Sequence, residues 1–173
     1  MSKGDGGIFV NTIGNPPENS FDGVLLSLYK VTLWAASKRE NLKGREKKTF
    51  NTAFNTASVA YDESTGKFYY GRNGGCMQNG CQRNPILFGQ DGTGGILPSE
   101  SFNNYPVGNC AEVDAINNAL NDGAKLENLH LTTIHATKSK LGAPKQACLN
   151  CTMAFRGKIK ENTTGWYDSK ENL

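Results

Sequence analysis

The chain has 173 residues, of which 37% are hydrophobic and 20% charged, and this indicates one ordinary globular domain rather than two domains or a disordered segment. The formal net charge of +3 is compatible with a nucleic-acid substrate but does not by itself argue for one. The first residues are polar and rich in glycine, and no apolar run is long enough to span a bilayer, so we expect neither a signal peptide nor a membrane anchor.

The beginning of the chain is predicted to be a flexible lead-in followed by a long helix. Glycines and prolines are frequent over residues 1–20, which favours an irregular lead-in. The next segment, Phe21–Lys43, has apolar residues at helical spacing, with Asp22 as the expected N-cap and Gly44 as the expected stop. The positions predicted to share the apolar face are Val24, Leu28, Val31 and Ala35.

A basic stretch, Lys38–Lys48, covers the end of this helix and the residues after it. It contains Lys38, Arg39, Lys43, Arg45, Lys47 and Lys48. Such a run is usually a solvated helix end, which is the interpretation that we favour here. The alternative is a patch that contacts phosphate groups.

A β-hairpin is predicted next, followed by a long irregular segment. Ser58–Tyr61 and Lys67–Gly71 are rich in strand-forming residues and flank a polar turn that ends in glycine at Gly66. Residues 72–108 are rich in glycine and asparagine and include three prolines. Loops of this length inside a compact domain are usually functional or mobile.

The second half of the chain is predicted to alternate helix and strand. Asn109–Leu120 has a helical apolar face, and Leu129–Ala136 alternates as a strand does. A short helix is expected to begin near Cys148. The tail, from Lys158 through a turn to Trp166, is predicted to form a small closing hairpin.

Three cysteines and one glutamate form the most informative pattern of the chain. Cys110 and Glu112 stand at the start of one predicted helix, and the C-x-x-C pair Cys148 and Cys151 stands at the start of another. Three thiolates can hold one zinc ion and leave its fourth position open to water. A carboxylate beside them can move protons, so the pattern predicts metal-assisted hydrolytic deamination, with Glu112 as the catalytic residue.

Simpler interpretations of the same residues exist. Asn109 and Glu112 have the spacing of a helix capping box, in which the glutamate bonds to a backbone N–H. A closed structural zinc site would need a fourth ligand, and redox chemistry is a further use of C-x-x-C. The candidates for that fourth ligand are Cys76, Cys81, His130 and His135. Cys76 and Cys81 are equally compatible with a disulfide or with two free thiols.

The motifs resemble those of the zinc-dependent cytidine deaminase superfamily, whose pattern is [H/C]-[A/V]-E followed by P-C-x-x-C. The matching stretch runs from about Ser58 to the end of the chain. Within the superfamily the chain is most similar to the bacterial polymorphic-toxin deaminases of the YwqJ-like branch. It departs from the pattern in one place, because Ala147 stands where the proline before C-x-x-C is usual.

The resemblance implies a fold, a cofactor and a set of site residues. The fold is a three-layer α/β sandwich in residues 21–173, with a mixed sheet that opens with an antiparallel hairpin and with the zinc-bearing helices on one face. Zn²⁺ would be held by Cys110, Cys148 and Cys151, with Glu112 as the proton shuttle. The residues expected to contact the substrate are Asn73, Ala111 and Trp166. An aromatic residue near the end of the chain more often closes the core, which is the interpretation that we favour for Trp166, with a stacking platform for a base as the alternative.

The resemblance also implies a biochemical function, and we consider two alternatives to it. The expected activity is deamination of cytosine in nucleic acid, with single-stranded DNA as the first guess and duplex DNA or RNA as further possibilities. The expected setting is a secreted effector that acts in the cytoplasm of a target cell and is neutralised by an immunity protein. The alternatives are a free-nucleoside cytidine deaminase, which also uses C-A-E with three cysteines, and a non-catalytic zinc module.

Overall fold

The fold is built on a four-stranded mixed sheet. The computed structural model describes residues 20–42, 54–78 and 80–169. The strands are β1 (Thr56–Asp62), β2 (Lys67–Arg72), β3 (Leu129–His135) and β4 (Glu161–Asn162), in the order β2-β1-β3-β4. β1 pairs antiparallel with both β2 and β3, whereas β4 runs parallel to β3. The predicted hairpin is therefore confirmed, and Gly66 adopts a positive φ of 74° in its turn.

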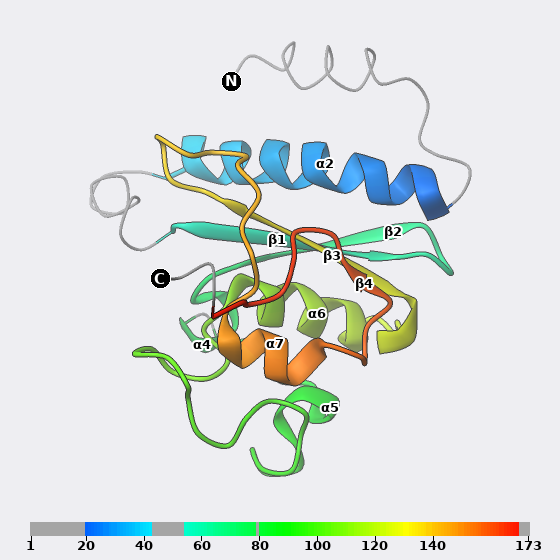
Figure 1. The fold of residues 1–173 in the computed structure, drawn as a ribbon, viewed down its shortest axis with the longest axis vertical. Helices are drawn as coiled ribbons and strands as arrows, with labels where there is room; N and C mark the ends of the chain where they lie inside the picture. Colours follow the sequence, from blue (N-terminus) through cyan, green and yellow to red (C-terminus); the bar gives the residue numbers. More distant parts are fainter. Residues whose placement is uncertain (1–19, 43–53, 79, 170–173) are drawn as a thin grey trace.

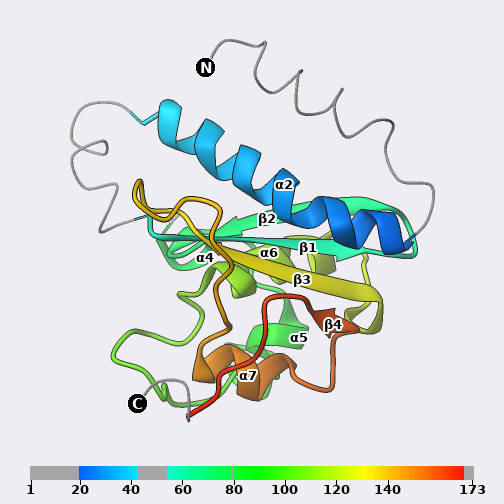
Figure 2. The same cartoon turned by 45° about the horizontal axis from the view of Figure 1, so that its top comes forward.

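Helices cover both faces of this sheet. α2 (Ser20–Glu40) crosses one face, and α6 (Ala111–Asn121) and α7 (Leu149–Phe155) lie on the other (Figures 1 and 2). Every residue of β1 is buried, as expected for a central strand that is covered on both sides. Each face has its own hydrophobic core: Val31, Ala35 and Ile134 belong to the core under α2, and Ile116, Leu131 and Phe155 to the core under α6 and α7.

The buried face of α2 differs from the predicted one. Val31 and Ala35 are fully buried as predicted, but Leu28 is 37% exposed and Val24 only half-buried. The buried row continues instead through Ser27 to Gly23, and a Cβ on Gly23 would overlap the ring of Tyr61. Small residues on this row let the helix approach the sheet closely, which the hydrophobic pattern alone does not reveal.

α6 lies unusually close to the hairpin because of a glycine in β2. A Cβ on Gly71 would collide with the backbone of Ala111 and Ala115 in α6. The absence of a side chain therefore permits direct contact between helix and strand. This contact places the first turn of α6, and Cys110 immediately before it, against the end of the sheet at which β2 finishes.

The long segment over residues 72–108 contains more structure than predicted. Two short helices, α4 (Gly75–Gln78) and α5 (Pro85–Phe88), interrupt it. Cys76 and Cys81 form a disulfide, which selects one of the two possibilities that the sequence leaves open. The 3₁₀ turn η1 (Leu126–Asn128) leads into β3.

The predicted closing hairpin is wrong for the described residues. After α7 the chain returns alongside β3. There the backbone N–H of Lys160 donates to the carbonyl of Leu129, and the backbone N–H of Thr163 donates to the carbonyl of Leu131. The short strand β4 is thus parallel to β3 and joined to it by a helical crossover. The Asn162 side chain then bonds to the Gly165 carbonyl and turns the chain, so that Trp166 follows in irregular structure.

Some predictions fall outside the described residues. These are the lead-in before Ser20, the stop at Gly44 and the basic stretch beyond Leu42. Asp22, the predicted N-cap, lies inside α2 rather than before it. Within the part that the structure describes, no helix combines the length and the apolar character needed to cross a membrane.

Candidate metal centre

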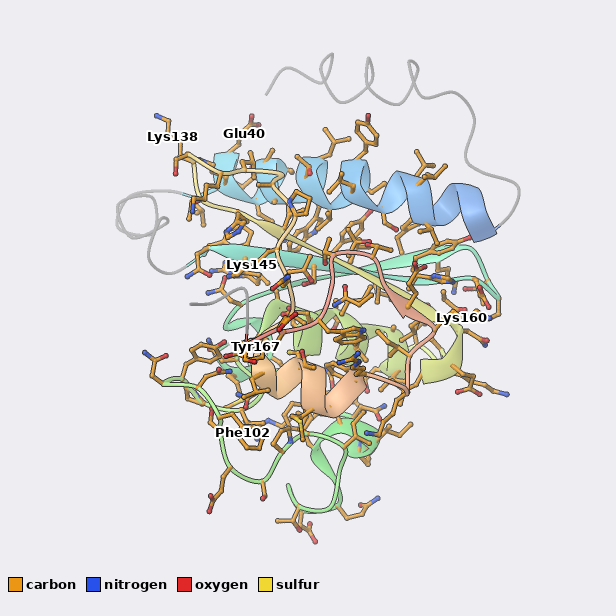
Figure 3. The ribbon with its side chains drawn as sticks, in the orientation of Figure 1. Glu40, Phe102, Lys138, Lys145, Lys160 and Tyr167 are labelled. Atoms are coloured by element: carbon orange, nitrogen blue, oxygen red, sulfur yellow. A yellow bond between two sulfur atoms is a disulfide. The ribbon has the colours of Figure 1, made fainter. Side chains whose placement is uncertain are left out.

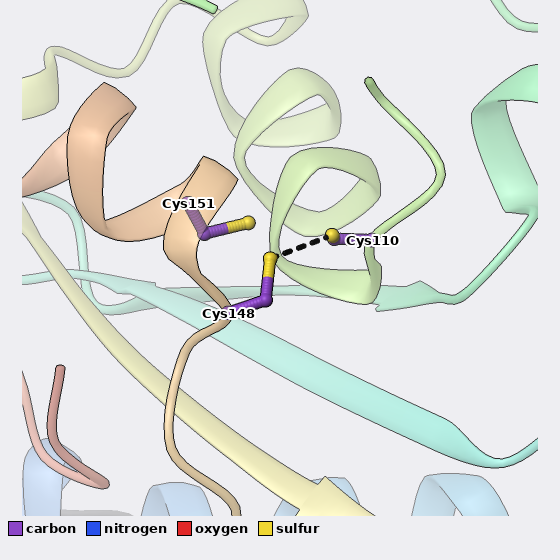
Figure 4. A group of neighbouring side chains, drawn as sticks. All are labelled: Cys110, Cys148 and Cys151. Carbon is purple, nitrogen blue, oxygen red and sulfur yellow. Dashed lines mark hydrogen bonds between the residues drawn. The ribbon is translucent and has the colours of Figure 1, made fainter. Parts of the chain in front are cut away.

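The three cysteines predicted to act together do meet in space. Cys110 is the N-cap of α6, Cys148 is the N-cap of α7, and Cys151 lies in the first turn of α7. Their Sγ atoms all lie within 4.8 Å of one another, and those of Cys110 and Cys148 are 3.2 Å apart. Figure 4 shows the three side chains pointing toward one another from the two helix starts. The cysteines therefore form a group that can bind a metal ion.

Helix starts favour this arrangement for a physical reason. Cys110 and Cys148 both have the extended backbone of an N-cap, with φ near −70°, and neither makes a side-chain cap hydrogen bond. The N–H groups and positive dipole ends of the helices stabilise negative charge on sulfur. Because Cys110 occupies the N-cap, the capping box that would begin at Asn109 does not form, and that interpretation is wrong.

The thiols interact strongly with one another. Hydrogen bonds from Cys110 and then from Cys151 hold the pKa of Cys148 far below its usual range. The hydrogen bond with Cys148 is the largest cause that raises the pKa of Cys110, and the hydrogen bond with Cys110, followed by that with Cys148, raises the pKa of Cys151. Tyr105 also bonds to Cys148, and burial first and this bond second raise the pKa of its hydroxyl. A polarisable sulfur cluster of this kind suits a thiolate-binding cation.

The described residues provide no fourth ligand for a closed site. No other cysteine, histidine, aspartate or glutamate of residues 20–42, 54–78 and 80–169 joins the three sulfurs in the metal-binding group. Cys76 and Cys81 bond to each other and are thus excluded as ligands. Three protein ligands with an open position are typical of catalytic rather than structural zinc sites.

The two histidines have other surroundings. Nε2 of His130 lies 2.8 Å from Oε2 of Glu63, and Nδ1 lies 3.1 Å from Oε2 of Glu161. Burial lowers the pKa of His135, and the charge of Lys145 lowers it further. Neither histidine belongs to the cysteine group, so the mixed site considered from the sequence is not formed.

A cavity of about 170 Å³ opens beside the sulfurs. Its lining is mixed in polarity and comes from the start of β1, the turn after β2, the loop before α6 with the first turn of that helix, and the segment before α7. The lining residues are Asn55, Thr56, Asn73, Tyr105, Asn109, Cys110, Ala111, Glu112, Lys145, Gln146 and Cys148. Several hydrogen-bonding groups thus converge on one small space beside the candidate metal ligands.

Glu112 contributes to this cavity from the first turn of α6. Its residue exposure is only 3%. Burial raises the pKa of its carboxyl to about 7 and the negative charge of Cys148 adds to this, whereas a hydrogen bond from its own backbone N–H and, to a smaller extent, the ammonium of Lys145 act in the opposite direction. The cavity therefore holds a carboxyl group that exchanges a proton near neutrality, next to the sulfurs.

Lys145 is a cavity residue that the sequence analysis missed. Its Nζ donates to Oγ1 of Thr56 over 2.6 Å, and among the described residues it is the only cationic side chain in the cavity lining. The available signal was its position three residues before Cys148, close enough in sequence to share the site. Tyr105 was also missed, because it lies in a long loop with no recognisable pattern.

The three predicted substrate contacts are placed differently from one another. Asn73 lines the cavity, and its Oδ1 accepts from the backbone N–H groups of Asn55 and Thr56, so it also holds the start of β1. Ala111 is buried and lines the cavity. Trp166 packs against the core under α6 and α7 and is not part of the cavity lining.

Comparison with known proteins adds no assignment to this geometry. No protein-family model, no curated protein and no solved structure matches the chain.

Proposed function

We propose that the chain catalyses zinc-dependent hydrolytic deamination of cytosine to uracil in nucleic acid, with single-stranded DNA as the first substrate to test. One observation carries this proposal: three convergent cysteine sulfurs and the buried carboxyl of Glu112 border the same cavity. A three-ligand thiolate site beside a carboxylate that does not ligate is the arrangement that zinc deaminases use.

The residues divide the chemistry among themselves. Cys110, Cys148 and Cys151 would hold the ion, which supplies the Lewis acidity that makes water a nucleophile at neutral pH. Glu112 would take one proton from the attacking water and deliver it to the ring nitrogen, and would then take the proton of the new hydroxyl on the ring carbon and deliver it to the departing amine. The water oxygen ends on the ring carbon, whose bond to the exocyclic nitrogen breaks, and ammonia leaves. Proton transfer by a positioned side chain accounts for about 10²–10⁴ in rate.

The fold supports the same family of enzymes. The antiparallel hairpin at the start of the sheet and the two cysteine-bearing helices on one face are the features expected of a cytidine-deaminase sandwich. We therefore propose that the sheet and its two helical layers are of this type. The further roles of toxin effector, target-cell cytoplasm and immunity partner rest on the motif resemblance alone.

The experiment that tests this proposal is a mass-spectrometric deamination assay. Zinc-loaded protein is incubated with single-stranded DNA, duplex DNA, RNA and free cytidine, and uracil or uridine formation is measured. Glu112→Gln should reduce turnover at least about 10²-fold with zinc content unchanged. The matched control is Glu127→Gln, an exposed glutamate on η1, which should keep full activity. If zinc-loaded protein converts none of these four substrates, the proposal is wrong.

A free-nucleoside deaminase is the second candidate. Asn73 lines the cavity, in a position from which an amide can contact a ribose hydroxyl. Conversion of cytidine with no conversion of any polymer would favour this candidate. A non-catalytic zinc module predicts instead that Glu112→Gln has no effect on the protein's function.

A further inference from the structure

We propose that the surface around the cavity binds a single-stranded polynucleotide along a path with a basic half and an aromatic half. This inference rests on the proposed function and names the substrate class of that site. The basic half consists of Lys138, Lys140 and Lys145, and the aromatic half of Phe102 and Tyr167. A free nucleoside would occupy the cavity alone, so only a polymer can reach residues on both sides of it.

The aromatic half is built onto the metal-site helix. The residues on either side of Cys151 each hold one surface segment through a side chain. Oδ1 of Asn150 accepts from the N–H of Phe102 over 2.9 Å, and Oγ1 of Thr152 accepts from the N–H of Tyr167 over 2.9 Å. The first turn of α7 therefore positions both aromatic residues as well as the sulfur of Cys151.

Further hydrogen bonds tie these two segments to the cavity wall. Ser101 accepts from Nδ2 of Asn150 over 3.0 Å and donates to the carbonyl of Tyr105 over 2.6 Å, and the Tyr105 side chain lines the cavity. On the other side, the N–H of Ala147 donates to the carbonyl of Gly165 over 3.0 Å, next to Gln146 in the cavity lining. The loop before α6 and the segment after β4 thus border the same opening.

Phe102 presents an exposed aromatic ring on an anchored backbone. It is 56% exposed although its backbone is anchored on a buried asparagine. Tyr167 is half-buried. In proteins that bind single-stranded nucleic acid, exposed aromatic faces serve as stacking platforms for bases, and stacking tolerates any base sequence.

The basic half begins inside the cavity and continues outside it. Lys145 lines the cavity, and Lys138 and Lys140 are exposed on the loop that follows β3. This loop packs on α2, since a Cβ on Gly142 would touch Thr32. In the view of Figure 3, Lys138, Lys145, Tyr167 and Phe102 follow one another from top to bottom on the left side, with Glu40 next to Lys138 and Lys160 on the right side. The positive charge complements phosphate, and the aromatic end complements bases.

The test measures binding without turnover. Zinc-loaded Glu112→Gln protein is titrated into a fluorescein-labelled oligodeoxycytidylate of about 12 nucleotides, and anisotropy is recorded. Introducing Phe102→Ala into the Glu112→Gln protein should weaken oligonucleotide binding about 10-fold. Introducing Phe102→Trp instead should keep the original affinity. The matched control is Tyr29→Ala, because Tyr29 is an aromatic residue 48% exposed on α2, on the other face of the sheet.

The salt dependence tests the basic half of the path. Lys140→Gln should lower the slope of log affinity against log salt by about 0.7, the value for one phosphate contact on a single strand. No binding by the parent protein, binding unaffected by Phe102→Ala, or tighter binding to a duplex of the same sequence would each overturn the inference.

Failure of this inference and failure of the proposed function give different results. If the binding pattern is found but no cytosine is converted, the polynucleotide surface stands and the reaction is wrong. If Phe102→Ala reduces conversion of cytidine and of the oligonucleotide by the same factor, the reaction stands and the surface is wrong. The expected result is loss of oligonucleotide conversion with cytidine conversion retained.

Discussion

At the scale of single residues, His130 shows how a residue of chemical interest is used for structure. It lies between two carboxylates that come from different segments, Glu63 after β1 and Glu161 in β4. Lys160 lies 3.6 Å from the other oxygen of Glu63. The cluster joins the end of the hairpin to the short strand at the edge of the sheet, and therefore helps to hold β4 in place.

This cluster makes stability depend on pH through Glu63. The hydrogen bond with His130 is the main cause that holds the pKa of Glu63 below its ordinary value of 4.5. The carboxylate therefore stabilises the fold above that value, and the stabilisation is lost as the pH falls through the lowered pKa. Glu63→Gln should cost about 1 kcal/mol of unfolding free energy at neutral pH and almost nothing in strong acid. Urea unfolding at both pH values checks this; an equal loss at both would contradict it.

At the scale of elements, the decisive arrangement is that α6 and α7 begin side by side. Each helix offers an N-cap cysteine, and α7 adds Cys151 one turn later. A metal ion held there would join the two helix starts to each other. Because such a site forms only in the folded chain, the free energy of metal binding adds to the free energy of folding.

Loss of one sulfur should therefore have two effects. Cys151→Ser should remove the bound metal and lower the thermal midpoint, and a chelator should no longer lower it further, because there is no metal to remove. The matched control is the double variant Cys76→Ser/Cys81→Ser, which loses only the disulfide and should keep its metal. Metal analysis and thermal unfolding with and without chelator measure both effects. Full metal content in Cys151→Ser would show that Cys151 is not a metal ligand.

At the scale of the whole molecule, the sheet separates two cores with different roles. The core under α6 and α7 includes Cys110 and Cys151, whereas the core under α2 contains no metal-site residue. Packing defects on the first side should therefore disturb the site, and equal defects on the second side should disturb only stability.

A pair of large-to-small substitutions tests this division. Leu131 and Val31 are both fully buried, the first under α6 and α7 and the second under α2. Leu131→Ala should cost about 2–5 kcal/mol of unfolding free energy and also speed the loss of metal to a chelator. Val31→Ala should cost about 2 kcal/mol and leave metal loss unchanged. Equal metal loss in both variants would show that the cores are not independent.

Local sequence determined much of this architecture. The hairpin, the helix after Cys110, the strand at residues 129–135 and the helix after Cys148 were all predictable, because turn residues and apolar periodicity act within a few residues. The meeting of the cysteines was predicted on the condition that the two helices begin side by side, a condition that the tertiary structure meets. Zinc and the deamination reaction remain predictions.

Only the tertiary structure decided the rest, because these features depend on residues far apart in the chain. The buried row of α2 through Gly23, the parallel path of β4 and the Cys76–Cys81 disulfide follow from neighbours that local patterns do not identify. Lys145 joined the cavity through a hydrogen bond to Thr56, 89 residues away. Phe102 came to the edge of the site because Asn150 holds its backbone, a contact that forms only when the loop folds back onto α7.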